Sequence, residues 1–172
     1  MTQHFKKERT FVAIKPDGVQ RTLIGEVIGR LEKVGLKLVA MKMVLPTASH
    51  IEKHYEKIDE KIRKHLVSFM TSGPVVAMVW EGAHSVKIVR KLVGKTEPLS
   101  SDVGTIRGDY VLDSYEMSDT DGRAIRNIIH ASGNVEEANE EIALWFKPEE
   151  VINYRHIQEE MLYDVNLDGI LE

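Results

Sequence analysis

The sequence contains no cysteine, and this absence removes several kinds of chemistry at once. Without a thiol there is no disulfide, no thiolate nucleophile and no cysteine-based zinc site. Long apolar runs are also missing. The opening stretch "MTQHFKKERTFVAIKPDG" holds only the short apolar segment "FVAI" before Lys15, which is too short for a signal peptide or a membrane span. We therefore expect a soluble, cytoplasmic protein with no membrane partner.

Neither sign of charge dominates, since the formal net charge is only −4. The surface as a whole has no reason to bind nucleic acid or an anionic membrane, so any anion must be held by a local cluster of Lys and Arg. The 172 residues, of which 42% are hydrophobic, suffice for one core. We predict a single domain over residues 1–172, with a short flexible tail from about residue 164.

Apolar patterns in the first half predict strands and helices in alternation. Three apolar runs bounded by charge or turn residues are expected to be strands: "FVAI" ending at Lys15, "LKLVAMKMVL" ending at Pro46, and "GPVVAMVW". Helical spacing follows each of them, over 24–31 with a stop at Gly35, over 47–71 with Thr47 or Ser49 as cap, and over 86–93 with a stop at Gly94.

The second half is less regular. Residues 95–107 are expected to form a long loop, and 110–130 a strand, a turn at 120–122 and a second strand. A helix is predicted to follow Asn134, which with Glu137 has capping-box spacing, and a last helix over 148–162. The order β-α-β-α-β-α-β-α without a repeat favours an α/β (α+β) sandwich, a ferredoxin-like βαββαβ fold with additional helices. A doubly wound parallel sheet is the rival.

His130 differs from the other histidines because it follows "NII" and precedes the small residues "ASG". Its ring should emerge where a strand ends, although from this pattern alone a core histidine and a functional one both remain open. The remaining histidines are expected at the surface: His4, His50, His54, His65, His84 and His156.

Two metal-like patterns are incomplete. His50 and His54 lie four residues apart, but no third ligand is indicated. The segment "DVNLDG" opens like a calcium loop, but the sequence ends at Glu172, before the glutamate that such a loop needs. We predict no protein-bound metal site, and an acidic tail at 164–169.

Three cations suggest an anion site. Lys15 ends a strand at a turn, Arg107 lies between two glycines in "GTIRGD", and Arg90 lies on a helix that otherwise faces the core. Together they would form one electropositive pocket for a polyphosphate. No P-loop is present, and "IGEVIGR" does not closely follow a strand. Side chains would therefore hold the phosphates.

Several segments carry a family resemblance: "ERTFVAIKPDGVQR", "HY", "SGPVVAMVWEG", "GTIRGD", "NIIHAS" and "EIALWFKPEE". Through them the chain resembles nucleoside diphosphate kinase from about residue 8 to about residue 163. The resemblance implies an enzyme that moves the γ-phosphoryl group of a nucleoside triphosphate such as ATP to a nucleoside diphosphate. It implies a ping-pong mechanism through a phosphohistidine, which maintains NTP and dNTP pools. It also implies a homo-oligomer, a hexamer or a tetramer, no specific nucleic-acid partner, and Mg²⁺ carried on the nucleotide phosphates.

The same resemblance assigns roles to individual residues. It makes His130 the nucleophile, supported by Ser132 and by Glu141, whose hydrogen bond to one ring nitrogen leaves the other free to attack phosphorus. It assigns the phosphates and ribose to Lys15, Tyr55, Arg90, Thr96, Arg107 and Asn127. Lys15 would also act in catalysis, because phosphoryl transfer needs cations at the transferring group.

The chain departs from the family in three places. Gly133 replaces an aspartate, so Asn134 is expected to cap the next helix while the loop is looser. An aromatic base platform is missing, and Ile62 or, counted from Tyr55, Arg63 takes its place. An acidic insertion within 110–124 is read as a hairpin at an oligomer interface, or as a solvated loop.

These departures leave an alternative function open, a nucleotide-binding oligomeric scaffold or regulator with impaired phosphotransfer. A histidine phosphatase or mutase is disfavoured because the Arg-His-Gly opening of such enzymes is missing.

Overall fold

A four-stranded antiparallel sheet forms the centre of the computed structural model, which describes residues 5–164 and 166. The strands lie in the order β2-β3-β1-β4 and are β1 (Glu8–Ile14), β2 (Lys37–Val44), β3 (Val75–Gly82) and β4 (Ile129–Ala131). This is the ferredoxin-like βαββαβ arrangement, so the predicted fold is confirmed. The parallel-sheet rival is wrong, because each pair of neighbouring strands is antiparallel.

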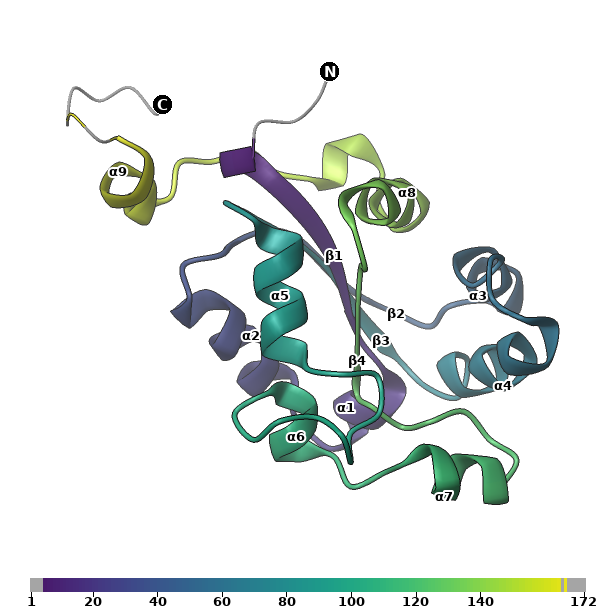
Figure 1. The fold of residues 1–172 in the computed structure, drawn as a ribbon. Coiled ribbons are helices and arrows are strands. Elements are labelled where there is room, and N and C mark those ends of the chain that lie inside the picture. The colour runs from purple at the N-terminus through teal and green to yellow at the C-terminus, as the bar shows by residue number, and fades with distance from the viewer. Residues whose placement is uncertain (1–4, 165, 167–172) are drawn as a thin grey trace.

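Helices cover both faces of the sheet (Figure 1). They are α1 (Pro16–Gln20), α2 (Ile24–Lys33), α3 (Ala48–His54), α4 (Glu60–Met70), α5 (Ser85–Val93), α6 (Ile106–Tyr110), α7 (Tyr115–Thr120), α8 (Val135–Trp145) and α9 (Ile157–Tyr163), with short 3₁₀ turns η1 (Phe5–Lys7) and η2 (Pro148–Glu150). Helices α2 and α5 pack on one face, and α3, α4 and α8 pack on the other.

Because helices pack on both faces of the sheet, the protein has two apolar cores, one on each face. Val27 and Val89 pack with Trp80 under α2 and α5, while Phe11 and Trp145 lie in the core beneath α3, α4 and α8. Because β3 is covered on both faces, all of its residues are buried, which explains its apolar run from Val75 to Trp80. The central strands therefore form a rigid base for residues at their ends.

The predicted helix over 47–71 is two helices. Thr47 caps α3 as expected, but α3 ends at His54, and the carboxylate of Asp59 accepts the amide hydrogen of Lys61 to start α4. An aspartate at an N-cap satisfies helix amides that have no partner within the helix, so it begins a new helix within a polar stretch. The connection that results carries Tyr55, the C-cap of α3.

The first strand predicted within 110–130 and the hairpin proposed for the insertion at 110–124 are wrong, because α6 and α7 lie there. A turn does follow α7 at 121–122, and the predicted second strand is confirmed only at its end, as β4. Thr105 caps α6 and Ser114 caps α7, each by accepting a backbone N–H three residues later. Helix α6 thus begins within the predicted loop 95–107. Ser and Thr at such positions favour helix starts over strands.

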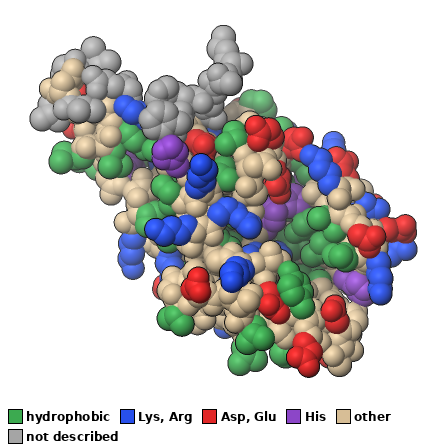
Figure 2. All heavy atoms as spheres, viewed as in Figure 1, with side chains coloured by type: hydrophobic (Ala, Val, Ile, Leu, Met, Phe, Trp, Pro, Cys, Tyr) green, Lys and Arg blue, Asp and Glu red, His purple; other side chains and the backbone are tan. Residues whose placement is uncertain are grey.

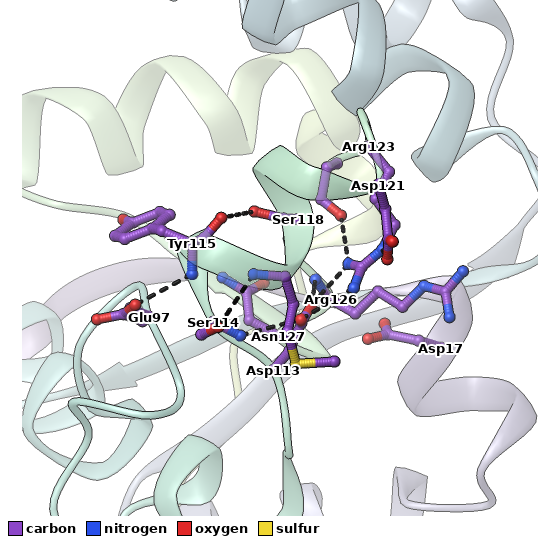
Figure 3. Close-up of polar contacts among 12 residues, drawn as sticks. Asp17, Glu97, Asp113, Ser114, Tyr115, Ser118, Asp121, Arg123, Arg126 and Asn127 are labelled. Atoms are coloured by element: carbon purple, nitrogen blue, oxygen red, sulfur yellow. Dashed lines mark hydrogen bonds and ion pairs between the residues drawn. The ribbon is translucent and has the colours of Figure 1, made fainter.

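Asp113 anchors this insertion (Figure 3). Its side chain is 3% exposed and accepts hydrogen bonds at 2.7 and 3.0 Å from the guanidinium of Arg123 and at 2.7 Å from the backbone N–H of Arg126. Tyr115, at the start of α7, donates its backbone N–H to Glu97 at 3.0 Å. Hydrogen bonds therefore hold the two ends of the insertion together and also attach the insertion to the loop before α6.

The predicted last helix over 148–162 is interrupted. After η2 the chain extends, and the N–H of Ile152 donates to Val39 O on β2 at 2.8 Å. Helix α9 then packs through a buried ion network, in which Lys37 Nζ lies 2.7 Å from Glu81 and 2.5 Å from Glu159. The calcium-like segment at 164–169 falls mostly outside the described residues.

Candidate active site

His130 lies at the middle of β4 and faces an open cleft of about 800 Å³. Figure 2 shows a histidine at the bottom of a hollow in this face, with Lys and Arg side chains beside it. Nearly every residue that the resemblance implicates lines this cleft: Lys15, Tyr55, Ile62, Arg90, Thr96, Arg107, Asn127, His130 and Glu141. Ser132 is fully buried behind it. The fold thus brings together residues separated by more than a hundred positions.

The backbone before His130 is strained. Ile128 has φ +54°, in the left-handed region that is unfavourable for a β-branched residue. Hydrogen bonds hold it on both sides: Ile128 O accepts from Lys15 N at 2.8 Å, and Ile128 N donates to Asp17 at 3.1 Å. Such strain persists only where the surroundings enforce it. Here it couples the turn after β1 to the segment that enters β4.

Glu141 connects α8 to His130 on β4 and to Ser132 just after that strand. Its Oε1 lies 2.6 Å from His130 Nε2, and its Oε2 accepts the hydroxyl hydrogen of Ser132 at 2.6 Å. Ser132 in turn accepts from the backbone N–H of Phe11 at 3.2 Å. With Nε2 donating to the carboxylate, the proton of a neutral His130 ring lies on Nε2, and Nδ1 keeps its lone pair.

Burial and the surrounding charges keep the His130 ring neutral. Desolvation and the nearby Lys15 ammonium lower the pKa of His130 to about 3. Burial raises the pKa of Glu141, and the hydrogen bond from Ser132 opposes that rise. A neutral imidazole beside a hydrogen-bonded carboxylate is a nucleophile at neutral pH.

Three cations surround this imidazole, as the sequence predicted. The Arg107 guanidinium donates to backbone carbonyl oxygens, at 2.9 Å to Lys95 and at 2.6 Å to Ile129, and Arg90 approaches Ala131 O at 3.5 Å. Burial and the Arg107 charge lower the pKa of Lys15 to about 7. Burial and Arg90 lower the pKa of Arg107 to about 10. The lowered pKa values of Lys15 and Arg107 show that like charges are crowded here, and an anion between them would stabilise their charged forms.

Asn127 joins two walls of the cleft. Its Oδ1 accepts from Lys15 Nζ at 2.8 Å, and its Nδ2 donates to Thr96 O at 2.8 Å. Asn127 is buried, whereas the Thr96 side chain stands at the exposed rim. The amide thus sets the position of the lysine ammonium.

The opposite wall is largely apolar. Ile62 is 55% exposed and lines the cleft with Ile58 and Leu66. Arg63 is not among the cleft-lining residues, and its guanidinium donates to Glu56 O at 3.0 Å. Of the two alternatives for the platform, Ile62 is therefore the one that lines the cleft. Tyr55 is buried, and its hydroxyl has no hydrogen-bond partner within the described chain. An orphan buried hydroxyl lining a cleft is suited to a ligand.

Several cleft residues were not assigned to the site from the sequence, among them His54, Tyr115, Ile125 and Glu137. His54, expected at the surface, has a side chain only 1% exposed and lies beside His130. Tyr115 comes from the insertion, Ile125 from the segment after it, and Glu137 from α8. Only "HY" within the family-like segments pointed toward His54. Nothing in the insertion marked Tyr115, because a loop's course depends on tertiary contacts.

Glu137 occupies the space beside Gly133. Its N–H donates to Asn134 Oδ1 at 2.7 Å, so the expected cap is confirmed, while its carboxylate accepts from the Gly133 N–H at 3.0 Å instead of closing the expected box on Asn134. A Cβ at residue 133 would lie 2.7 Å from that carboxylate. The start of α8 is therefore fastened by two hydrogen bonds despite the glycine.

A ferredoxin-like sheet that sets a neutral histidine among crowded cations in a cleft defines a class of phosphoryl-transfer enzyme. The comparisons agree with that class. A family model described as "Nucleoside diphosphate kinase" matches residues 8–151. The chain belongs to the nucleoside diphosphate kinase family, and it is an enzyme that transfers phosphoryl groups between nucleotides.

Individual relatives cover most of the chain. The chain is 51% identical over 158 residues to a nucleoside diphosphate kinase of Aspergillus fumigatus, which covers 91% of this chain and 97% of the relative. It is 50% identical over 160 residues to nucleoside diphosphate kinase 4, chloroplastic, of Spinacia oleracea, covering 92% of this chain and 64% of that protein. A solved Borrelia burgdorferi nucleoside-diphosphate kinase, titled a transition state mimic with bound vanadate and ADP, matches with TM-score 0.88 and 41% identity over 92% of this chain and 98% of that one.

Proposed function

We propose that the chain works by a ping-pong mechanism in which Nδ1 of His130 takes the γ-phosphoryl group of a nucleoside triphosphate such as ATP and passes it to a nucleoside diphosphate. The observation that carries this proposal is the pairing of Nε2 with Glu141 at 2.6 Å. It leaves the Nδ1 lone pair available for attack. In the first step the Nδ1–P bond forms, the bond from phosphorus to the β–γ bridging oxygen breaks, and the diphosphate leaves. The second step is the reverse transfer to another diphosphate.

The neighbouring cations have roles in this mechanism. Lys15, Arg90 and Arg107 would stabilise the charge on the phosphate oxygens as transfer proceeds. Tyr55, Thr96 and Asn127 would contact the phosphates and ribose, and Ile62 the base. The Borrelia structure holds ADP and vanadate, a phosphoryl mimic, according to its title, which supports a nucleotide in the corresponding cleft.

Mg²⁺ would be bound by the nucleotide phosphates and not by side chains of the protein. Within the described chain, the group of side chains close enough to hold a metal is His54, His130 and Glu141, and this buried, nitrogen-rich set does not suit a cation that prefers oxygen ligands and bound water. The ion would therefore be carried mainly by the phosphates, where it neutralises charge. Its loss by chelation is expected to stop transfer.

We also propose a homo-oligomer, a hexamer or a tetramer. Edge strand β2 exposes Met41 and Met43 at 52% and 57%, and exposed apolar side chains on a sheet edge favour association. Sedimentation would give the mass, and deleting 115–122 would show whether the insertion takes part. A cytoplasmic location stays part of the proposal, testable by cell fractionation. No helix of the described chain is long and apolar enough to cross a membrane.

A labelling experiment tests the mechanism. With γ-labelled ATP and magnesium, the wild type should form an acid-labile phosphoenzyme that a nucleoside diphosphate discharges, and His130→Ala should not. A wild type that takes no label, or a variant labelled equally, would overturn the mechanism. A wild type that takes no label would support the alternative of a nucleotide-binding scaffold, which no feature of the described site favours.

A further inference from the structure

His54 ends α3 with its ring against both His130 and Glu141. Its Nε2 lies 3.6 Å from Glu141 Oε1, the same oxygen that accepts from His130. The two imidazole rings meet edge to face, with centroids 4.6 Å apart and planes at 75°. The side chain of His54 is 1% exposed, so water does not compete for these contacts.

Trp145 on α8 fixes the tautomer of His54. The indole Nε1 donates to His54 Nδ1 at 3.1 Å, and an indole nitrogen can only donate. Nδ1 must therefore hold a lone pair. Because burial and the neighbouring His130 lower the pKa of His54 to about 3, the ring is neutral and its proton lies on Nε2. The positive end of the N–H dipole thus faces the Glu141 carboxylate.

This tautomer argues against a metal. Ligand atoms of His54, His130 and Glu141 lie within 4.8 Å of one another, a spacing that would suit a zinc ion. A ligating Nε2 must be free of its proton, however, and that would move the proton to Nδ1 and break the bond from Trp145. In this cluster the Nε2–H groups of His54 and His130 are both directed at the Glu141 carboxylate, which is an arrangement for hydrogen bonding and not for binding a metal ion.

We propose that His54 is a positioning residue for phosphoryl transfer: oriented by Trp145, it holds the Glu141 carboxylate and the His130 ring so that Nδ1 of His130 faces the cleft. This inference rests on the proposed role of His130 as the phosphoryl acceptor. His54 does not touch the transferring group in this account. It acts through Glu141 and through the ring face of His130.

The physical reason lies in the burial of Glu141. Its side chain is 7% exposed, and a buried carboxylate needs donors to stay ionised. Ser132 supplies one hydrogen bond to Oε2, and His130 supplies another to Oε1. The His54 dipole adds attraction at the oxygen that sets the His130 tautomer. An apolar replacement would remove this attraction and leave the His130 ring free to reorient.

The decisive variants are His54→Leu and His54→Gln. Leucine removes both polar ends of the ring, whereas glutamine can accept from Trp145 and donate toward Glu141. The matched control is His50→Phe: His50 lies one turn earlier on α3 and packs edge to face on Trp145 at 4.4 Å, but it does not line the cleft. Steady-state kinetics and ¹⁵N–¹H spectra of the histidine rings would be recorded for each.

We expect His54→Leu to lower kcat about 10- to 100-fold, the cost of a small misplacement of reacting groups, with KM for the nucleotides unchanged. The spectra of the free protein should show His130 protonated on Nε2 in the wild type and in both tautomers in His54→Leu. His54→Gln should regain most of the lost kcat, and His50→Phe should keep the wild-type values.

A folded His54→Leu protein with wild-type kcat, or a glutamine variant no better than the leucine variant, would overturn the proposal. If His54→Leu does not fold, Trp145→Phe replaces it, because this variant keeps His54 but removes the donor to Nδ1. If Trp145→Phe has a lower kcat and His54 is found in both tautomers, the proposal is supported. If neither kcat nor the His54 tautomer changes, the proposal is overturned. Failure of the wild type to form phosphohistidine would instead refute the proposed function.

Discussion

Glu141 Oε1 lies 2.6 Å from His130 Nε2, so that the carboxylate on α8 determines which ring nitrogen of the β4 histidine is free. The other carboxylate oxygen is held by Ser132 at 2.6 Å. Together the two bonds fix the ring in one orientation. The chemistry of the cleft therefore depends on a contact between helix α8 and strand β4, and not on any feature of His130 alone.

Removing this carboxylate should be costly. We expect Glu141→Ala to lower kcat about 100-fold or more, in the range of lost general acid–base or orienting groups, with KM little changed. Glu136→Gln is the control, because Glu136 is exposed on the same helix and does not line the cleft. Rapid-quench measurement of phosphoenzyme formation would check the chemical step. An alanine variant as fast as the control would contradict the orienting role.

Nucleotide binding should take up a proton above neutral pH. The free enzyme has Lys15 with a pKa lowered to about 7 by burial and by Arg107, so the lysine is mostly neutral at pH 8. Phosphates favour its charged form and raise its pKa on binding. Nucleotide affinity should therefore fall as the pH rises through 7.

Calorimetry at pH 8 in buffers of different ionisation enthalpy would measure this uptake. We expect the wild type to bind a net proton with each nucleoside diphosphate, and Lys15→Met to bind none from this source. Binding without any proton uptake by the wild type would show that Lys15 is already charged in the free enzyme.

An aromatic ring at residue 62 should tighten nucleotide binding. Ile62 lines the cleft, and we propose that it stands where the family resemblance places an aromatic platform. Base stacking of about 1 kcal/mol would then lower KM about fivefold in Ile62→Phe. Arg63→Phe is the matched control, because Arg63 points back to Glu56 O. If Ile62→Phe leaves KM unchanged for every nucleotide, the base does not rest on this wall.

The insertion should depend on Asp113. Its buried carboxylate takes two hydrogen bonds from Arg123 and one from the Arg126 backbone, so Asp113→Ala should lower the free energy of unfolding by about 3 kcal/mol. Asp121→Ala provides the comparison, since Asp121 is 55% exposed and pairs with the same arginine, and should cost less than about 1 kcal/mol. Urea titration would measure both, and equal losses would contradict the anchoring role.

The strands β1, β2 and β3 could be predicted because each contains an apolar run that packs in the core. The apolar runs alone did not decide between an antiparallel and a parallel sheet, because strand pairing depends on tertiary contacts. Helices in the polar half were harder, since Asp59, Thr105 and Ser114 begin helices that periodicity alone does not reveal. A single polar side chain at a cap decides between a continued helix, a loop and a new helix.

The site was predictable where residues belong to short family-like segments, such as His130 and Arg107. It was not predictable where tertiary packing moves a residue out of its expected environment. His54 reads as part of a polar helix but is buried against Trp145. Tyr115 reaches the cleft only because the Asp113 network fixes the course of the insertion.

The identity of the phosphorylated nitrogen tests the account most directly. Wild-type protein labelled with ATP and magnesium would be examined by ³¹P NMR and by tandem mass spectrometry under alkaline conditions, which preserve phosphohistidine. The account expects the phosphoryl group on Nδ1 of His130, because Glu141 holds Nε2. Phosphate on Nε2 of that ring, or on another side chain, would contradict it.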